Sequence, residues 1–274
     1  MSISIRLCLL LLIPLVLAGC IEEETEEEIP KKTEPAEGVK LTILYDNNPG
    51  DPNLRSAWGF SCLVQMKGMN LLFDTGGDWR TLEHNMRELR IDPRSIGIVL
   101  LSHAHGDHTG GLGGFLAVNP NVEVWLPGSF PPSFKRSISQ AGAIVREVGP
   151  DPVEIRPNLF STGEMGTWIK EQSLVIRLKA GLAVITGCAH PGVVNIVQRA
   201  KERIGGEVYL VMGGFHLGGA NDRELRYIIS SFRGLGVRKV APCHCSGNRA
   251  RELFRQEYNA DYIDAHVGSV IELP

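Results

Sequence analysis

The sequence lacks the motifs that mark serine hydrolases and nucleotide-dependent phosphotransferases. It has no Gly-X-Ser-X-Gly elbow to present a nucleophilic serine, and no Gly-rich P-loop to hold a nucleotide phosphate. It also lacks clustered Lys and Arg, so we expect no nucleic-acid partner. If the chain is an enzyme, its nucleophile must come from another kind of site.

Long apolar runs are confined to the first twenty residues. Leu7–Leu17 is apolar, Arg6 precedes it, and Leu17-Ala18-Gly19-Cys20 follows. The run is shorter than the roughly 20 residues that span a bilayer. It resembles a lipoprotein signal, residues 1–19, whose removal leaves Cys20 to carry a lipid; a plain signal peptide and an uncleaved anchor are the alternatives. We therefore expect an extracytoplasmic protein anchored to the membrane through lipidated Cys20.

Residues 20–39 contain almost nothing that could be buried. Positions 21–39 carry eight Glu and two Lys, together with Pro30 and Pro35, which predicts a disordered acidic tether. The chain has a net charge of −3, of which this segment contributes −6 and Arg6 +1, so residues 40–274 are close to +2. That length is enough for one large domain with its own core.

Cysteine is also scarce, with six residues in the chain. Cys8 leaves with the signal, and Cys20 is the expected anchor. The remaining four could be thiols, metal ligands or two disulfides, and their spacing does not choose among these states: Cys62, Cys188, Cys243 and Cys245.

Hydrophobic periodicity predicts strands in the first part of each half, and alternating helices and strands later. We interpret this pattern as α/β, with two packed mixed sheets and helices on their outer faces, a four-layer α/β/β/α sandwich. The expected strands are 40–45, 59–66, 69–73, 96–101, 122–126, 143–148, 171–178, 182–186, 208–212, 238–242 and 267–273. The expected helices are 79–89, 110–118, 133–141, 193–203, 223–235 and 249–258.

The densest polar motif is His103-Ala104-His105-Gly106-Asp107-His108, directly after the apolar run Ile96–Leu101. Two histidines one residue apart can turn toward one ion, and the following Asp-His pair can reach a second. Imidazole and carboxylate at this density suit Zn²⁺, Mn²⁺, Fe²⁺ or Co²⁺ better than Ca²⁺ or Mg²⁺. Further polar residues follow four other expected strands, where α/β folds collect active-site loops: Asp74, His190, His216 and His244.

These residues resemble the metallo-β-lactamase superfamily, through the His-X-His-X-Asp-His signature, Asp74, His190 and His244. Within this superfamily, the sequence is similar to the subgroup named for dihydropterin ribofuranosyl-aminobenzene phosphate synthase. That enzyme joins a dihydropterin diphosphate to an aryl ribose phosphate. The segments that carry it are Asp46-Asn47-Asn48, Trp58–Ser61, Leu72–Gly76, Gly187–Gly192, Gly213–Leu217 and Pro242–Cys245.

The resemblance implies two divalent metal ions, with Zn²⁺ expected and Mn²⁺, Fe²⁺ or Co²⁺ as alternatives. His103, His105 and His190 would hold the first ion, and Asp107, His108 and His244 the second. Asp74 would accept hydrogen bonds that orient the histidine loop. Where many members have a bridging Asp, this chain has Cys188, so either Cys188 ligates or the bridge is water or hydroxide alone.

The expected function is hydrolysis or group transfer on a small-molecule ester, phosphoester or diphosphate, with hydroxide supplied by water on the metal. Asp107 and His216 are the candidate catalytic residues, although His216 could instead be a buried structural histidine. Asn47, Trp58 and Ser61 are candidate substrate contacts, and Trp58 could equally belong to the core. The alternative function is a membrane-tethered lipoprotein that binds a metal or solute without turnover.

Overall fold

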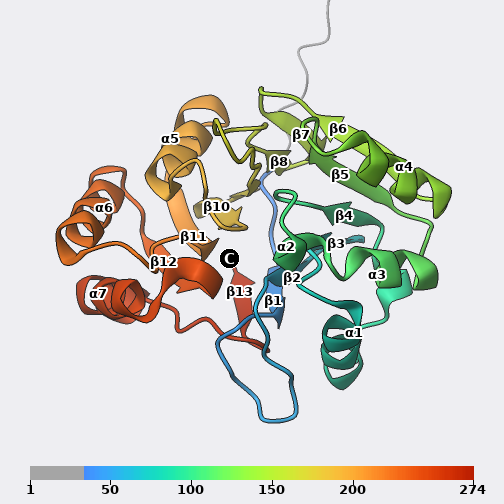
Figure 1. The fold of residues 1–274 in the computed structure, drawn as a ribbon. Helices are drawn as coiled ribbons and strands as arrows, with labels where there is room; N and C mark the ends of the chain where they lie inside the picture. Colours follow the sequence, from blue (N-terminus) through green and yellow to red (C-terminus); the bar gives the residue numbers. More distant parts are fainter. Residues whose placement is uncertain (1–33) are drawn as a thin grey trace, which may run out of the picture. The chain divides into compact units, whose positions relative to one another are not determined.

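Two β-sheets stand face to face in the computed structural model, which describes residues 34–274 (Figure 1). The first sheet has seven strands in the order β13-β1-β2-β3-β4-β5-β6, and the second has six in the order β12-β11-β10-β9-β8-β7. The first comprises β1 (Val39–Tyr45), β2 (Ser61–Met66), β3 (Met69–Phe73), β4 (Ile98–Leu100), β5 (Glu123–Pro127), β6 (Ile144–Val148) and β13 (Val270–Leu273). The second comprises β7 (Val153–Arg156), β8 (Leu159–Ser161), β9 (Leu174–Leu178), β10 (Gly181–Thr186), β11 (Val208–Gly214) and β12 (Lys239–Cys243).

Amphipathic helices cover the outer face of each sheet (Figure 1). Helices α1 (Trp79–Glu88), α3 (Leu112–Val118) and α4 (Pro132–Gln140) pack on the first sheet, and α5 (Val193–Arg203), α6 (Asp222–Gly234) and α7 (Asn248–Tyr258) pack on the second. A four-residue helix, α2 (Gly106–Thr109), and short 3₁₀ turns at Pro93–Ser95, His244–Ser246 and Asn259–Asp261 complete the described elements. The predicted four-layer α/β/β/α sandwich is confirmed.

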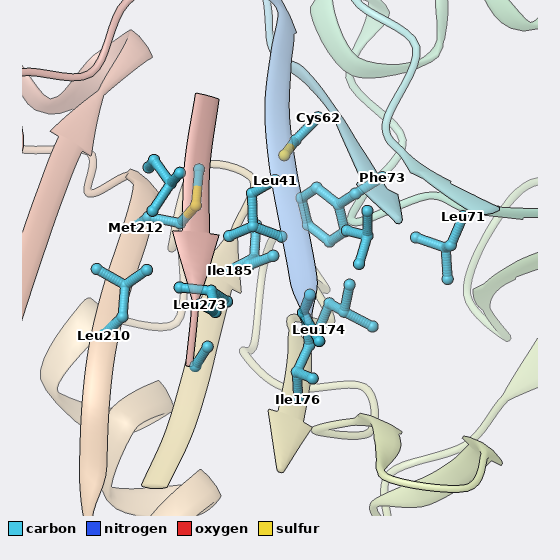
Figure 2. Close-up of a cluster of buried hydrophobic side chains, with 14 of the residues drawn as sticks. Leu41, Cys62, Leu71, Phe73, Leu174, Ile176, Ile185, Leu210, Met212 and Leu273 are labelled. Carbon is cyan, nitrogen blue, oxygen red and sulfur yellow. The ribbon is translucent and has the colours of Figure 1, made fainter. Parts of the chain in front are cut away.

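The central core lies between the sheets and follows from the two-residue period of the strands. In β3, Leu71 and Phe73 face the inner core while Leu72 faces the helices; in β4, Val99 is the one that faces outward. Figure 2 shows Leu41 and Phe73 of the first sheet near Ile185 and Met212 of the second. Because both faces of β3 and β4 are buried, these strands appear in the sequence as continuous apolar runs.

The central strands of both sheets are parallel. Strand β3 pairs with β4 through Phe73 and Leu100, and β10 pairs with β11, which pairs with β12. Parallel strands present their carboxyl ends at one edge of a sheet, so the loops after β3, β4, β10, β11 and β12 collect there. This edge carries all five polar segments that the sequence singled out.

Most element predictions are confirmed within one or two residues, and the helix at 193–203 and the strand at 69–73 match fully. The last strand begins at Val270 rather than Val267, because Gly268 adopts a φ of 85° in the turn that precedes it. Strands β7 and β8 were not predicted. They are only four and three residues long, and prolines at positions 150, 152 and 157 interrupt the segment that contains them.

The chain enters the body at the opposite end of the sheets from the polar loops. The Ala36 amide donates to Arg177 O at 3.0 Å, and Asn158 Nδ2 donates to Glu34 O at 2.6 Å. The predicted signal, Cys20 and residues 20–33 of the predicted tether lie outside the described residues. Residues 34–39, which were also assigned to the tether, instead lie against the body, and β1 begins at Val39. Among residues 34–274, no helix has the length and apolar character to cross a membrane.

Candidate metal centre and cleft

Three histidines from two loops converge on one point. His103 and His105 follow β4, and His190 follows β10. Their ring centroids are 4.6–4.9 Å apart, and one nitrogen from each lies within 4.8 Å of the other two. A divalent ion about 2.0–2.1 Å from each nitrogen fits such a group.

A second group of donors lies beside the first. Oδ2 of Asp107 is 3.4 Å from Nε2 of His244 and 3.7 Å from Nε2 of His108. The three donor atoms again lie within 4.8 Å of one another. The ring centroids of His103 and His108 are 4.2 Å apart, so the two donor groups are adjacent.

In two of these histidines, a neighbouring side chain contacts one ring nitrogen and leaves the other free for a ligand. Nδ1 of His103 lies 2.8 Å from Ser102 Oγ, and Nδ1 of His244 lies 2.9 Å from Asn47 Oδ1. In contrast, Nε2 of His103, His190 and His244 is buried without a hydrogen-bond partner. Each unsatisfied buried polar group costs about 1–3 kcal/mol, and a bound cation would satisfy all three. The donor set fits divalent transition metals.

Burial and mutual proximity keep two of these rings neutral, as ligation requires. Burial is the main cause that lowers the pKa of His103, with the neighbouring rings adding to it. Burial, followed by the proximity of His216, lowers the pKa of His190 to about 4. His108 differs: burial disfavours its charge, but the Asp74 carboxylate outweighs burial and raises the pKa.

Asp74 fixes the start of the histidine loop. It is fully buried, and its carboxylate accepts hydrogen bonds from the amide and hydroxyl of Ser102 and contacts Nδ1 of His108, each at 2.7 Å. The close packing here also explains Gly187, since a Cβ at that position would lie 2.1 Å from Ser102 Oγ.

Glu171, which belongs to none of the sequence motifs, holds the loop that carries His190. The carboxylate is buried and accepts the backbone N–H groups of Cys188, Ala189 and His190 at 2.8–2.9 Å. Burial raises the pKa of Glu171 to about 7, because it outweighs the three N–H donors. The available signal was a carboxylate at the start of the predicted strand 171–178, just before its apolar part, Leu174–Ile176.

Backbone strain is concentrated in the same loops. Non-glycine residues with φ between 47° and 60° occur at Asp74, Ala189, His216 and His244. Each such residue costs of order 1–3 kcal/mol and persists only where its surroundings hold it. In the His244 loop, Asp46 does this by accepting the His244 amide at 3.0 Å.

Cys188 lies between the two donor groups. Its Sγ is 3.2 Å from Nε2 of His108 and belongs to a donor group with His103 and His108. It is also 3.4 Å from Sγ of Cys245. The hydrogen bond between the thiols raises the pKa of Cys188 and lowers that of Cys245. All four described cysteines are free thiols.

The three candidate substrate contacts are placed differently. Trp58 is 61 % exposed, and its ring centroid is 5.1 Å from that of His244. Ser61 is fully buried and donates to Asp74 O at 2.8 Å, so it supports the site from behind. Asn47 uses both side-chain polar atoms on His244, which differs from the expected substrate contact.

An open cleft of about 1170 Å³ begins at the histidines and extends toward the first turns of α5 and α6. Trp58, His190 and His216 line its metal end. His216 is exposed, and its ring centroid is 4.4 Å from that of His190. A hydrogen bond to Cys245 raises the pKa of His216, although burial opposes this effect. Asn195, Arg223 and Tyr227 line the far end.

Comparison with known proteins agrees with this geometry. Residues 59–194 match the family model described as the metallo-beta-lactamase superfamily. The 7,8-dihydropterin-6-methyl-4-(β-D-ribofuranosyl)-aminobenzene-5'-phosphate synthase of Methanocaldococcus jannaschii is 30 % identical, over 86 % of this chain and 97 % of that protein.

Two solved structures have the same fold. The structure of Tm1679, described as a metal-dependent hydrolase of the β-lactamase superfamily, has a TM-score of 0.72 and 30 % identity, over 86 % of this chain and 99 % of that one. A diphosphatase from the PhnP family has a TM-score of 0.59 at 16 % identity, over 86 % of this chain and 97 % of that one. At that identity, the second likeness supports the fold alone.

Proposed function

Because the chain belongs to the metallo-β-lactamase superfamily, we propose that it is a dinuclear metal-dependent hydrolase or transferase for a small-molecule ester, phosphoester or diphosphate. The observation that carries this proposal is the set of three buried, partnerless Nε2 atoms in two adjacent donor groups, one of which, through His190, borders an open cleft. His103, His105 and His190 would hold one ion, and Asp107, His108 and His244 the other. Zn²⁺ is the ion we expect, with Mn²⁺, Fe²⁺ or Co²⁺ as alternatives.

The bound ions would act as Lewis acids and lower the pKa of water toward 7. Asp107 is suited to hold and orient the attacking water. Burial opposes ionisation of Asp107, but the ring of His244, whose Nε2 lies 3.4 Å away, and the charge of His108 keep its pKa well below the usual range. It is therefore a carboxylate at neutral pH, able to accept a hydrogen bond from water.

His216 lines the cleft next to His190, at the end of the cleft that is closest to the metal-binding histidines. Its raised pKa favours a protonated ring, which can donate a hydrogen bond to a developing negative charge on the leaving group. The exposed indole of Trp58 on the metal end and the phenol of Tyr227 further along the cleft offer flat apolar surfaces for an organic substrate.

The synthase relative suggests a finer candidate. Its name describes a product with a pterin, an aryl ring and a ribose phosphate. Identity of 30 % over most of both chains, together with the size of the cleft, supports a similar transfer for this chain. Secretion, if it occurs, favours hydrolysis of an external small molecule instead.

We also propose that the protein is extracytoplasmic and anchored to a membrane through lipidated Cys20, with the acidic segment that follows as the tether. Labelling with a fatty-acid probe tests this directly. Label that disappears in Cys20→Ala supports the anchor, and a protein without label contradicts it.

Turnover by the metal-loaded full-length protein tests the enzymatic proposal. The assay compares phosphomonoesters, phosphodiesters, diphosphates, lactones and a pterin diphosphate supplied with an aryl ribose phosphate. We expect turnover in at least one class, lost in Asp107→Ala and kept in Asp151→Ala, whose carboxylate is exposed. Tight binding without turnover of any compound would favour the tethered binding protein.

A further inference from the structure

We propose that Cys188 and Cys245 are an oxidation site, where a reversible disulfide forms and switches off the metal centre. The two Sγ atoms are 3.4 Å apart, although the residues are 57 positions apart in the chain. A disulfide requires an S–S distance of about 2.05 Å, so the sulfurs must approach by only about 1.4 Å. The other two cysteines make no such contact within residues 34–274: Cys62 lies in the core between the sheets, and Cys243 lies against Asp46.

The cleft gives one of the two sulfurs access to a small oxidant. Cys245 lines the open cleft beside His216, whereas Cys188 lies behind it against His108. A peroxide can therefore reach Cys245 first. Cys188 is the only described thiol within contact of Cys245, so it is placed to resolve the oxidised sulfur.

The chemistry requires one hydroperoxide for each disulfide. The Cys245 sulfur attacks an oxygen of hydrogen peroxide, the O–O bond breaks, and a sulfenic acid and one water form. The Cys188 sulfur then attacks the sulfenic sulfur, the S–O bond breaks, and a second water leaves with the thiol proton. In total, two thiols lose two electrons and two protons, and the peroxide is reduced to two water molecules.

The bond would act on both donor groups. It takes Cys188 Sγ from its place beside His108 Nε2, and it ties the loop of His190 to the loop of His244. A disulfide sulfur has no thiolate charge to offer a metal. We therefore expect the oxidised protein to lose ions from the centre. This consequence rests on the proposed function, whereas formation of the disulfide does not.

The test treats full-length protein, with and without removal of metal by a chelator, with hydrogen peroxide. Remaining thiols are then blocked with N-ethylmaleimide, and the peptides are analysed by mass spectrometry. We expect a cross-linked peptide pair containing Cys188 and Cys245, lighter than the separate thiol peptides by two hydrogens. Dithiothreitol should restore both thiols, and metal content should fall on oxidation and return after reduction.

Two variants make the result specific. Cys245→Ser should abolish the cross-link, whereas Cys62→Ala should retain it. Should Cys245→Ser fail to fold, the wild-type peptide map alone decides the proposal. Thiols that survive peroxide, a link to Cys243, or irreversible oxidation of Cys245 without a link would each overturn it. A disulfide in a protein that binds no metal would support the oxidation site and contradict the proposed function.

Discussion

Oδ2 of Asp74 lies 2.7 Å from Nδ1 of His108, and both side chains are fully buried. This contact fixes which nitrogen of His108 faces the donor group with Asp107 and His244. The same carboxylate also holds the Ser102 amide and hydroxyl. One residue at the end of β3 therefore sets the position of a loop that begins at the end of β4.

Asp74→Asn should weaken metal binding without removing a ligand. The amide places an N–H donor against His108 or Ser102, which disturbs the ring that the second ion needs. Loss of such a supporting contact typically costs 10–100-fold in metal affinity. Competition with a fluorescent chelator measures the effect, and Asp151→Asn is the control because that carboxylate is exposed. Equal affinities in the two variants would contradict the role assigned to Asp74.

Glu171→Gln should loosen the loop that carries His190. The amide nitrogen would face a backbone N–H that now donates to the carboxylate, and an unsatisfied buried contact costs about 1–3 kcal/mol. Denaturant unfolding of metal-free protein measures this below pH 7, where the contribution of Glu171 is still present, with the surface variant Glu202→Gln as the control. A loss no larger than that of the control would exclude the role.

The contribution of Glu171 to the free energy of unfolding should depend on pH in one direction. Because the folded pKa of Glu171 is about 7 and the ordinary value is 4.5, the folded state holds the proton more tightly. Its contribution to the free energy of unfolding is complete below pH 4.5. This contribution falls by about 3 kcal/mol as the pH rises through 7. In metal-free protein, the difference in unfolding free energy between wild type and Glu171→Gln should fall across this range. A difference that grows with pH would be the opposite result.

The sequence predicted the parts of this site that are local in the chain. His103–His108 are consecutive, and each other expected ligand follows a recognisable strand, so strand order alone places them at one edge. The supporting contacts are different. Asn47 and His244 are 197 residues apart, and Glu171 binds the loop that follows β10. Such contacts depend on how the two sheets face each other, which no periodicity encodes. This is why Asn47 and Ser61 were expected in the cleft and instead support it.

Cys188→Asp should change the choice of metal. A thiol at this place favours Zn²⁺, whereas a carboxylate oxygen suits Mn²⁺ and other harder ions. We expect the ratio of Mn²⁺ to Zn²⁺ affinity to rise on the order of tenfold, the scale of other contacts around metal sites. Competition titrations with both metals give the ratio, and Cys62→Ala serves as the matched control. An unchanged ratio would mean that Cys188 does not touch the ions.

Trp58→Ala should affect substrate binding more than chemistry. The indole is 61 % exposed and lines the cleft, so its removal leaves the core intact. Loss of an aromatic contact worth about 1.4 kcal/mol raises KM about tenfold with kcat nearly unchanged. Trp168→Ala is the control, since Trp168 is 99 % exposed and does not line the cleft. A fall in kcat with KM unchanged would contradict this role for Trp58.

The most direct test of the dinuclear centre is the metal content of purified protein, measured by elemental mass spectrometry. We expect close to two ions per chain in the wild type, a clear loss in His105→Ala, and no change in His84→Ala, whose ring contacts only surface groups. Protein that stays free of metal after growth and reconstitution with Zn²⁺, Mn²⁺ and Fe²⁺ would contradict a dinuclear metal centre.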